Sequence, residues 1–241
     1  MTPRTIHDHP VSHAELNQGP NTVTAHTAFA SQWMSLAKRL GIGNDISTGV
    51  LRELIGAYGS IDRHYHGVAH VIFMLEAIDT LSTSFTSPDT ARLATFAHDV
   101  IYHPGRSDNE ARSAAWLREK LASSALSPAL LDGAEKMVLA TKNHRRTGNP
   151  DVDLLVDIDM SVLGQPWDDY KTYAAGVMRE YVPHYGDAGF RKGRVERFLV
   201  PTMAAPEIFV TETYKPLTAQ ARKNMAQEAE LLRSGASLDM P

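Results

Sequence analysis

The chain has 241 residues, of which 43% are hydrophobic and 22% charged, and its formal net charge is −4 at pH 7. This length and composition fit one globular domain, and the mildly acidic balance argues against a general nucleic-acid binder, which usually has a basic stripe. Because cysteine is absent, disulfides, thiolate nucleophiles and sulfur-ligated zinc sites are excluded, so a metal would need histidine and carboxylate ligands. No apolar run is long enough to span a bilayer and none resembles a signal peptide, so we expect a cytoplasmic protein.

Residues 1–25 are polar and contain Pro10 and Pro20, which predicts a flexible N-terminal arm. From residue 26 to residue 241, apolar residues recur at helical spacing without an internal repeat, which predicts one all-α domain. The stretch 151–160 alternates as a strand would, but no partner strand is evident, so we favour a helix there. Gly41 is expected to end the first helix. The expected helices cover residues 25–40, 51–58, 62–81, 88–101, 109–121, 128–142, 153–163, 167–181, 188–199 and 218–232.

The helix expected over residues 62–81 is apolar nearly all round, so it should be central and buried. His66 and His70 interrupt it four residues apart, which would place both imidazoles on one helix face. Buried imidazoles need partners, so the two are either core histidines bonded to backbone or metal ligands. Gly67 stands where the HExxH zinc helix has glutamate, which excludes that kind of zinc site.

The helix expected over residues 88–101 has a second polar interruption, the adjacent pair His98 and Asp99. A buried carboxylate is costly unless it is paired or bound to a cation. The pair therefore either binds a metal ion or includes an ion pair with an arginine such as Arg92 or Arg112.

A third cluster places Asp157 and Asp159 among apolar residues. An EF-hand calcium loop is excluded because its sixth position would be Val162 instead of glycine. These aspartates are either metal ligands or carboxylates that stabilise a helix N-terminus or an ion pair. Taken together, two imidazoles and two carboxylates would neutralise a divalent ion and leave coordination positions for water and substrate.

The ordered set of a histidine, a His-Asp doublet and a distant aspartate resembles the HD superfamily of metal-dependent phosphohydrolases. The residues that match its metal ligands are His70, His98, Asp99 and Asp159. The resemblance extends from about residue 30 to about residue 235 and is greatest to a bacterial group of predicted HD phosphohydrolases. It implies a single HD-domain-like helical bundle. The matching stretches are RHYHGVAH, FAHDVIYHPGRSDNEARSA, ATKNH, DIDMSVLG, MREY and ARKNMAQE.

The stretch YHGVAH is also similar to the YHNxxH helix of cyclic nucleotide phosphodiesterases. That resemblance implies that His70 is a metal ligand and that His66 is the acid that protonates the leaving oxygen. The last ligand of those enzymes begins an Asp-Leu-Ser triplet, which matches residues 159–161 here and favours Asp159 over Asp157. Asp99 is expected to bind the metal and to orient the attacking water.

Two further groups of residues are candidates for the site. Glu110 is either a carboxylate at a helix N-terminus or a group that holds a histidine ligand, and the resemblance favours the site. The segment TKNHRR offers phosphate-binding groups, although it could equally be a solvated basic turn; its candidates are Lys142, His144 and Arg145. His103 and His184 are expected to be surface or loop residues.

The sequence thus predicts an enzyme that hydrolyses a phosphate ester or anhydride of a nucleotide or related small molecule. Its expected cofactor is one divalent ion, with manganese, magnesium, zinc, cobalt, nickel and iron all compatible with these ligands. No nucleic-acid or membrane partner is expected. A di-iron oxygenase of HD type competes with this prediction, but only His103 and His144 lie between the doublet and the last aspartate as further ligands. A catalytically silent binding module and a purely structural helical protein are also compatible with a helical fold.

Overall fold

The computed structural model describes residues 20–238, and throughout this range the regular structure is helical, with no β-strand. The predicted all-α fold class is therefore confirmed. The helices are α2 (Pro20–Arg39), α3 (Asn44–Tyr58), α4 (Val68–Thr80), α5 (Pro88–Ala97), α6 (Asn109–Leu121), α7 (Pro128–Ala140), α8 (Pro150–Met160), α9 (Trp167–Gly193), α10 (Val200–Ala204) and α11 (Thr218–Ser234). Shorter elements are the 3₁₀ turns η1 (Ser82–Ser84), η2 (Ser161–Gly164) and η4 (Lys215–Leu217) and the π-helix η3 (Arg194–Leu199).

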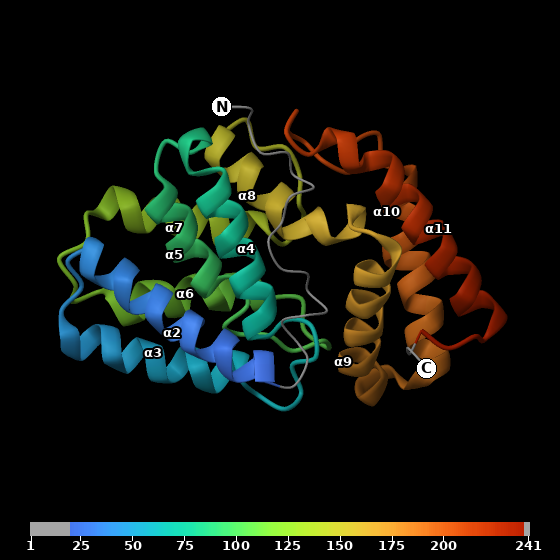
Figure 1. Ribbon diagram of the computed structural model, residues 1–241, viewed down its shortest axis with the longest axis horizontal. Helices are drawn as coiled ribbons and strands as arrows, with labels where there is room; N and C mark the ends of the chain where they lie inside the picture. Colours follow the sequence, from blue (N-terminus) through green and yellow to red (C-terminus); the bar gives the residue numbers. More distant parts are fainter. Residues whose placement is uncertain (1–19, 239–241) are drawn as a thin grey trace.

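The helices form two groups that lie next to each other in Figure 1. In the first group, α4 packs against α2, α5 and α8, and α7 packs against α5 and α6. The second group, coloured orange to red, contains α9, η3, α10 and α11. Within α9, Gly186 has φ 70° and ψ 164°, a conformation that glycine adopts without a steric penalty. The chain reverses there, so the second part of α9 and η3 pack beside its first part.

Helix α4 is the centre of the first group, as its apolar sequence predicts. It is buried without interruption from Val68 to Leu75, and His70 within this run is only 1% exposed. A helix with no polar face is stable only when other elements surround it, and α2, α5 and α8 do so here. The polar ring of His70 is therefore held deep in the core, where it needs polar partners.

Helix α4 begins later than the sequence pattern indicated, at Val68 instead of near residue 62. Gly67 precedes it in an extended conformation with φ −114° and ψ −164°, and residues 62–67 form turns. His66 is therefore not on the same helix as His70, and the expected helical-face relationship between them is wrong. The ring centroids are nevertheless 6.0 Å apart, because the turn folds back beside the helix.

Helix α5 also differs from the expectation, because it ends at Ala97 instead of continuing to residue 101. The amide of Val100 donates to the carbonyl of Ala97, which closes a turn directly after the helix. His98 is the C-cap residue and Asp99 lies in the turn. The two adjacent side chains nevertheless face one point, since Nε2 of His98 and Oδ2 of Asp99 are 3.1 Å apart.

Some of the other predicted helix ends agree with the structure. Helix α3, however, begins at Asn44 instead of residue 51, and the predicted helices 167–181 and 188–199 are replaced by α9 and η3. Gly41 follows α2 with φ 68°, the left-handed conformation in which glycine commonly ends helices. The 151–160 stretch forms α8, and the Asn149 side chain caps it by accepting the amides of Asp151 and Val152. Helix α2 already begins at Pro20, and the rest of the predicted arm, residues 1–19, lies outside the described residues. Among the helices of the described chain, none combines the length and apolar character needed to cross a membrane.

Candidate metal centre and active site

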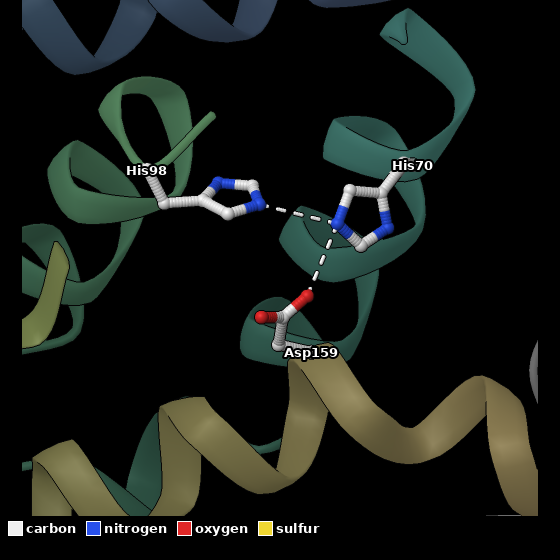
Figure 2. A group of neighbouring side chains, drawn as sticks. All are labelled: His70, His98 and Asp159. Atoms are coloured by element: carbon white, nitrogen blue, oxygen red, sulfur yellow. Dashed lines mark hydrogen bonds and ion pairs between the residues drawn. The ribbon is translucent and has the colours of Figure 1, made fainter. Parts of the chain in front are cut away.

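Three candidate ligands converge from three helical segments, as Figure 2 shows. His70 lies on α4, His98 directly follows α5, and Asp159 lies in the last turn of α8. The two Nε2 atoms are 3.2 Å apart, and Asp159 Oδ1 is 3.1 Å from Nε2 of His70. One ligand atom from each residue lies within 4.8 Å of the others, so a single ion can contact all three.

The orientation of His98 suits metal binding. Its Nδ1 donates to the carbonyl of Thr95 at 2.8 Å, so Nε2 is the ring nitrogen that faces the other candidate ligands and is available to a cation. Two imidazole nitrogens facing each other at 3.2 Å repel unless a proton or a cation lies between them. Both histidines are 1% exposed, so water cannot relieve that repulsion easily. The donor set therefore fits a divalent cation.

Asp99 adds a fourth candidate ligand beside this group. Its Oδ2 lies 3.1 Å from Nε2 of His98. Burial lowers the pKa of His98, but Asp99, the charge of Asp159 and the hydrogen bond to Thr95 together outweigh burial and raise that pKa to about 9. The possible ion pair with Arg92 is not found, because its guanidinium contacts Asp79 and Asp89. Asp99 therefore depends on the histidine cluster, or on a cation bound there, for its charge balance.

The two aspartates of α8 face different parts of the protein. Asp159 reaches His70 through Oδ1 and His144 through Oδ2, at 3.1 Å and 2.7 Å. The Asp157 oxygens instead accept the backbone amides of Val210 and Thr211, at 2.8 Å and 2.7 Å. The geometry therefore favours Asp159 as the ligand and gives Asp157 the role of anchoring the segment before η4.

His144 occupies an unusual backbone position just after α7. Its φ of 48° makes it the one described non-glycine residue with a positive φ, a conformation that is uncommon outside glycine. The strained turn brings its Nε2 to 2.7 Å from Asp159 Oδ2. The sequence interpretation made His144 a phosphate-binding residue, whereas the structure places it against a candidate metal ligand.

His66 lies near the candidate metal ligands and is held by Glu180 of α9. Its Nδ1 donates to Glu180 Oε2 at 2.6 Å, while Oε1 accepts the backbone amides of Tyr65 and His66 at 2.7 Å and 3.0 Å. The Glu180 side chain is 1% exposed. Burial lowers the pKa of His66, but the charge and hydrogen bond of Glu180 and the charge of Asp99 together outweigh burial, so the pKa is raised above its ordinary value. His66 therefore carries a proton more readily near neutral pH than a free histidine.

A glycine makes the contact between α9 and the His66 turn possible. Gly176 is one turn before Glu180, on the same face of α9. A β-carbon on Gly176 would lie 2.9 Å from the carbonyl oxygen of His64 and 3.1 Å from Cβ of Tyr65. The absence of a side chain lets the turn approach α9 closely enough for Glu180 to accept its amides.

Arg63 joins the two turns that bear functional residues. Its Nη1 donates to the carbonyls of His66 and Asp99 at 2.8 Å and 2.9 Å, and its Nη2 donates to that of Val100 at 3.3 Å. The guanidinium also lies 5.0 Å from the ring centroid of Tyr102. Arg63 therefore fixes the His66 turn to the His98–Asp99 turn through backbone atoms.

A cavity of about 670 Å³ opens beside these residues. It lies between the metal-ligand segments of the first helix group and the α9–η3 segment of the second. Of the remaining predicted site residues, Glu110 and Lys142 line it, whereas Arg145 is exposed and does not. The residues of the first group that line it are Tyr65, His66, Asp99, Tyr102, Glu110, Thr141, Lys142, His144, Asp159, Met160, Val162 and Leu163.

Two expected roles are not supported by the contacts. Within the described residues, no hydrogen bond joins Glu110 to an imidazole, and the ring of His98 is held instead by Thr95. The ammonium of Lys142 donates to the carbonyl of Ser107 at 2.5 Å, so it is tied to the loop before α6. His103 and His184 are exposed, as expected, with ring centroids 4.6 Å apart.

The sequence interpretation did not assign Glu180 or Arg63 to the site. Glu180 lies in the MREY stretch that carried part of the resemblance, but a single acidic residue in an amphipathic helix reads as a solvated position. Only 4% of the whole Glu180 residue is exposed, and this burial is known only from the folded structure. The hydrogen bonds of Arg63 all go to backbone carbonyls. Because every residue has such a carbonyl, no partner residue type in the sequence indicates this role.

No model of a known protein family matches the sequence, and no curated protein matches it. Among solved structures, the chain is similar to the phosphodiesterase domain of the RhoPDE fusion protein from the choanoflagellate Salpingoeca rosetta. The similarity has a TM-score of 0.59 and 15% sequence identity, and it covers 92% of this chain and 94% of that domain. At this identity, the comparison shows that the two share a fold over nearly their full lengths.

Proposed function

We propose that this protein is a metal-dependent phosphohydrolase of HD type that cleaves a phosphate ester or anhydride of a small molecule such as a nucleotide. The observation that carries the proposal is the convergence of His70, His98 and Asp159, with Asp99 beside them, at one end of a cavity. Nitrogen and carboxylate ligands suit manganese, magnesium, zinc, cobalt, nickel or iron. The shared fold with a phosphodiesterase domain supports the same class of reaction.

The ion would be held by His70, His98, Asp99 and Asp159, and when bound it would polarise a phosphoryl oxygen and make water more acidic. Asp99 lines the cavity, so its carboxylate also contacts the space where a phosphate and a water molecule would lie. His66, whose pKa is raised, also lines the cavity and supplies positive charge there when it is protonated. The site thus combines ligands for a cation with groups that attract an anion.

His66 is the proposed general acid. With Nδ1 bonded to Glu180, its Nε2 is the nitrogen left to give a proton to the departing oxygen. In the hydrolysis, the oxygen of water bonds to phosphorus as the bond to the leaving oxygen breaks, and that oxygen takes the proton from His66. The proton that the attacking water loses passes to solvent, from which His66 is protonated again. Glu180 does not touch the reacting atoms; it fixes the ring and stabilises its protonated form.

A di-iron oxygenase has less support than a phosphohydrolase. Among the described residues, the candidate ligands form a single group, and His103, one of the two further histidines that a di-iron site would need, is exposed. His144 does lie beside Asp159, so an iron content of two per chain is the measurement that would favour the oxygenase.

The test begins with protein from which metal has been removed by a chelator. Each of the six candidate ions is added separately, and hydrolysis is measured with p-nitrophenyl phosphate, bis(p-nitrophenyl) phosphate and a panel of nucleotides. We expect no hydrolysis without metal and restoration by at least one ion. Hydrolysis that survives metal removal, or its absence with every ion, would overturn the proposal.

A further inference from the structure

The cavity has a second end that the proposed chemistry does not use. It extends from the metal ligands along α9 to the π-helix η3, and its volume of about 670 Å³ is in the range of small-molecule pockets. A phosphate group alone would leave most of this space empty. We call the side of the cavity formed by the last turn of α9 and by η3 the η3 wall. π-Helical turns occur frequently at functional sites, so this wall is a candidate for substrate recognition.

Two cationic side chains on this wall have no partner among the described residues. Lys192 and Arg197 both line the cavity and are exposed. Neither makes a hydrogen bond or ion pair with any residue in the described part of the chain. One acidic side chain, the exposed Glu196, lies on the same wall. A long cationic side chain on a cavity wall is available to bind an anion when no neighbouring carboxylate already neutralises it.

Arg194 fixes the backbone that carries these two cations. Its Nε donates to Glu228 Oε1 at 2.9 Å, and its Nη2 donates to the hydroxyl of Tyr173 at 2.9 Å. The side chains of Arg194 and Glu228 are 8% and 0% exposed. The charge of Arg194 is therefore balanced inside the protein, and its role is to hold η3 in place beneath Lys192 and Arg197.

Aromatic side chains connect this wall to the metal ligands. The ring of Tyr65 lies between those of His70 and Tyr173, with centroid distances of 4.8 Å and 4.6 Å. Farther along α9, Tyr181 and Tyr185 stack at 6.1 Å with an interplanar angle of 19°. The tyrosine rings line the cavity, where they offer flat apolar surface to a ring of the substrate.

We propose that Lys192 and Arg197 bind a second anionic group of the substrate, and that the substrate class is a nucleotide carrying a phosphate group in addition to the one that is cleaved. One phosphate lies at the metal end, the base and sugar lie along the aromatic surface, and the other phosphate lies at the η3 wall. This inference rests on the proposed hydrolysis for the location of the first phosphate.

The test compares substrates that differ in the second phosphate. Adenosine 3′,5′-bisphosphate, the two corresponding adenosine monophosphates, fructose 1,6-bisphosphate and p-nitrophenyl phosphate are assayed with metal-loaded protein. We expect adenosine 3′,5′-bisphosphate to have the lowest KM. The double variant Lys192→Gln/Arg197→Gln should raise that KM by about tenfold or more, with kcat little changed, because charged hydrogen bonds to phosphate are lost. Its KM for p-nitrophenyl phosphate should not change.

A matched control removes two exposed charges outside the cavity, Lys223→Gln/Arg233→Gln on α11, and should leave all these values unchanged. The inference is overturned if wild-type protein does not prefer the bisphosphate, or if the double variant loses efficiency equally with every substrate. If no phosphate ester is hydrolysed at all, the proposed function fails, while calorimetric binding of adenosine 3′,5′-bisphosphate to wild type and double variant still tests the η3 wall. Equal affinity of the two proteins would then reject it.

Discussion

At the metal end of the cavity the polar side chains are buried and bonded to one another, whereas at the η3 end Lys192 and Arg197 are exposed and have no partner in the described chain. His70 and His98 are each 1% exposed, and their nitrogens contact each other and carboxylates. Chemistry at a fixed point needs preorganised groups, because a shift of about 1 Å can cost 10²-fold in rate. Binding of a distal phosphate tolerates flexible side chains, so the two ends should respond differently to substitution.

The largest effects are expected at the metal end. His70→Ala and Asp159→Asn should each remove the bound ion and reduce hydrolysis to background, because each deletes a ligand from a compact set. Metal content per chain and kcat/KM are the measurements. His184→Ala, which changes an exposed histidine outside the cavity lining, is the control and should keep both. Full metal content in either ligand variant would contradict the assignment.

The next largest effect is expected for His66, and it distinguishes the proposed general acid from the candidate metal ligands. His66→Ala should retain the metal but lower kcat by about 10²–10⁴-fold for a substrate with a basic leaving oxygen. The loss should be smaller with p-nitrophenyl phosphate, whose leaving group needs little protonation. If His66→Ala instead loses the metal as fully as His70→Ala, then His66 is a ligand and the acid lies elsewhere.

The variant Glu180→Gln tests whether Glu180 raises the pKa of His66. Burial alone would lower the pKa of His66, and the Glu180 carboxylate is the main group that raises it. A general acid is active while protonated, so activity falls as pH rises through its pKa. Removing the carboxylate charge should lower that pKa and move the alkaline limb of the kcat/KM profile to lower pH. An unchanged limb would show that another group is the acid.

A smaller effect, on stability, distinguishes the two aspartates of α8. Asp157→Ala should lower the free energy of unfolding by about 2–4 kcal/mol, because the amides of Val210 and Thr211 lose their acceptor. Metal content of the folded fraction should not change. Asp159→Asn should instead lose the metal, because it removes the charge of a candidate ligand. Urea unfolding of metal-free protein measures the stability of the two variants. The division of roles would be rejected if both variants lost stability and metal to the same extent.

The smallest effects are expected from the exposed cations of the η3 end. Lys192→Gln and Arg197→Gln should each change the free energy of unfolding by less than about 0.5 kcal/mol, since neither side chain has a partner to lose among the described residues. Arg194→Met is the contrasting variant in the same segment, with an expected cost of about 3–5 kcal/mol because it leaves the Glu228 charge buried and unpaired. A large cost for Lys192→Gln or Arg197→Gln would show that these residues support the fold.

The sequence by itself determined the all-α fold and the residues that converge at the candidate metal centre. His70, His98 and Asp159 are polar groups inside strongly apolar segments, and burial of such groups requires a partner or a cation. Apolar periodicity reports which face of a helix is buried, so the interruptions of that face were visible from the residues alone. Their roles as ligands follow from chemistry and stay predictions to be tested by metal binding.

Only the tertiary structure decided which buried groups meet. Glu180 contacts His66 across 114 residues of sequence, and Asp157 anchors backbone more than 50 residues away. Arg145 belongs to the same basic turn as His144 but is exposed, while His144 reaches Asp159 through a strained backbone. The exact end of a helix depends on the conformation of a single turn, which apolar periodicity does not predict. The sequence pattern therefore could not show that His66 precedes α4 and that Asp99 follows α5. Contacts between residues far apart in the sequence depend on how the helices pack against one another. The spacing of apolar residues describes each helix separately, so it does not predict these contacts.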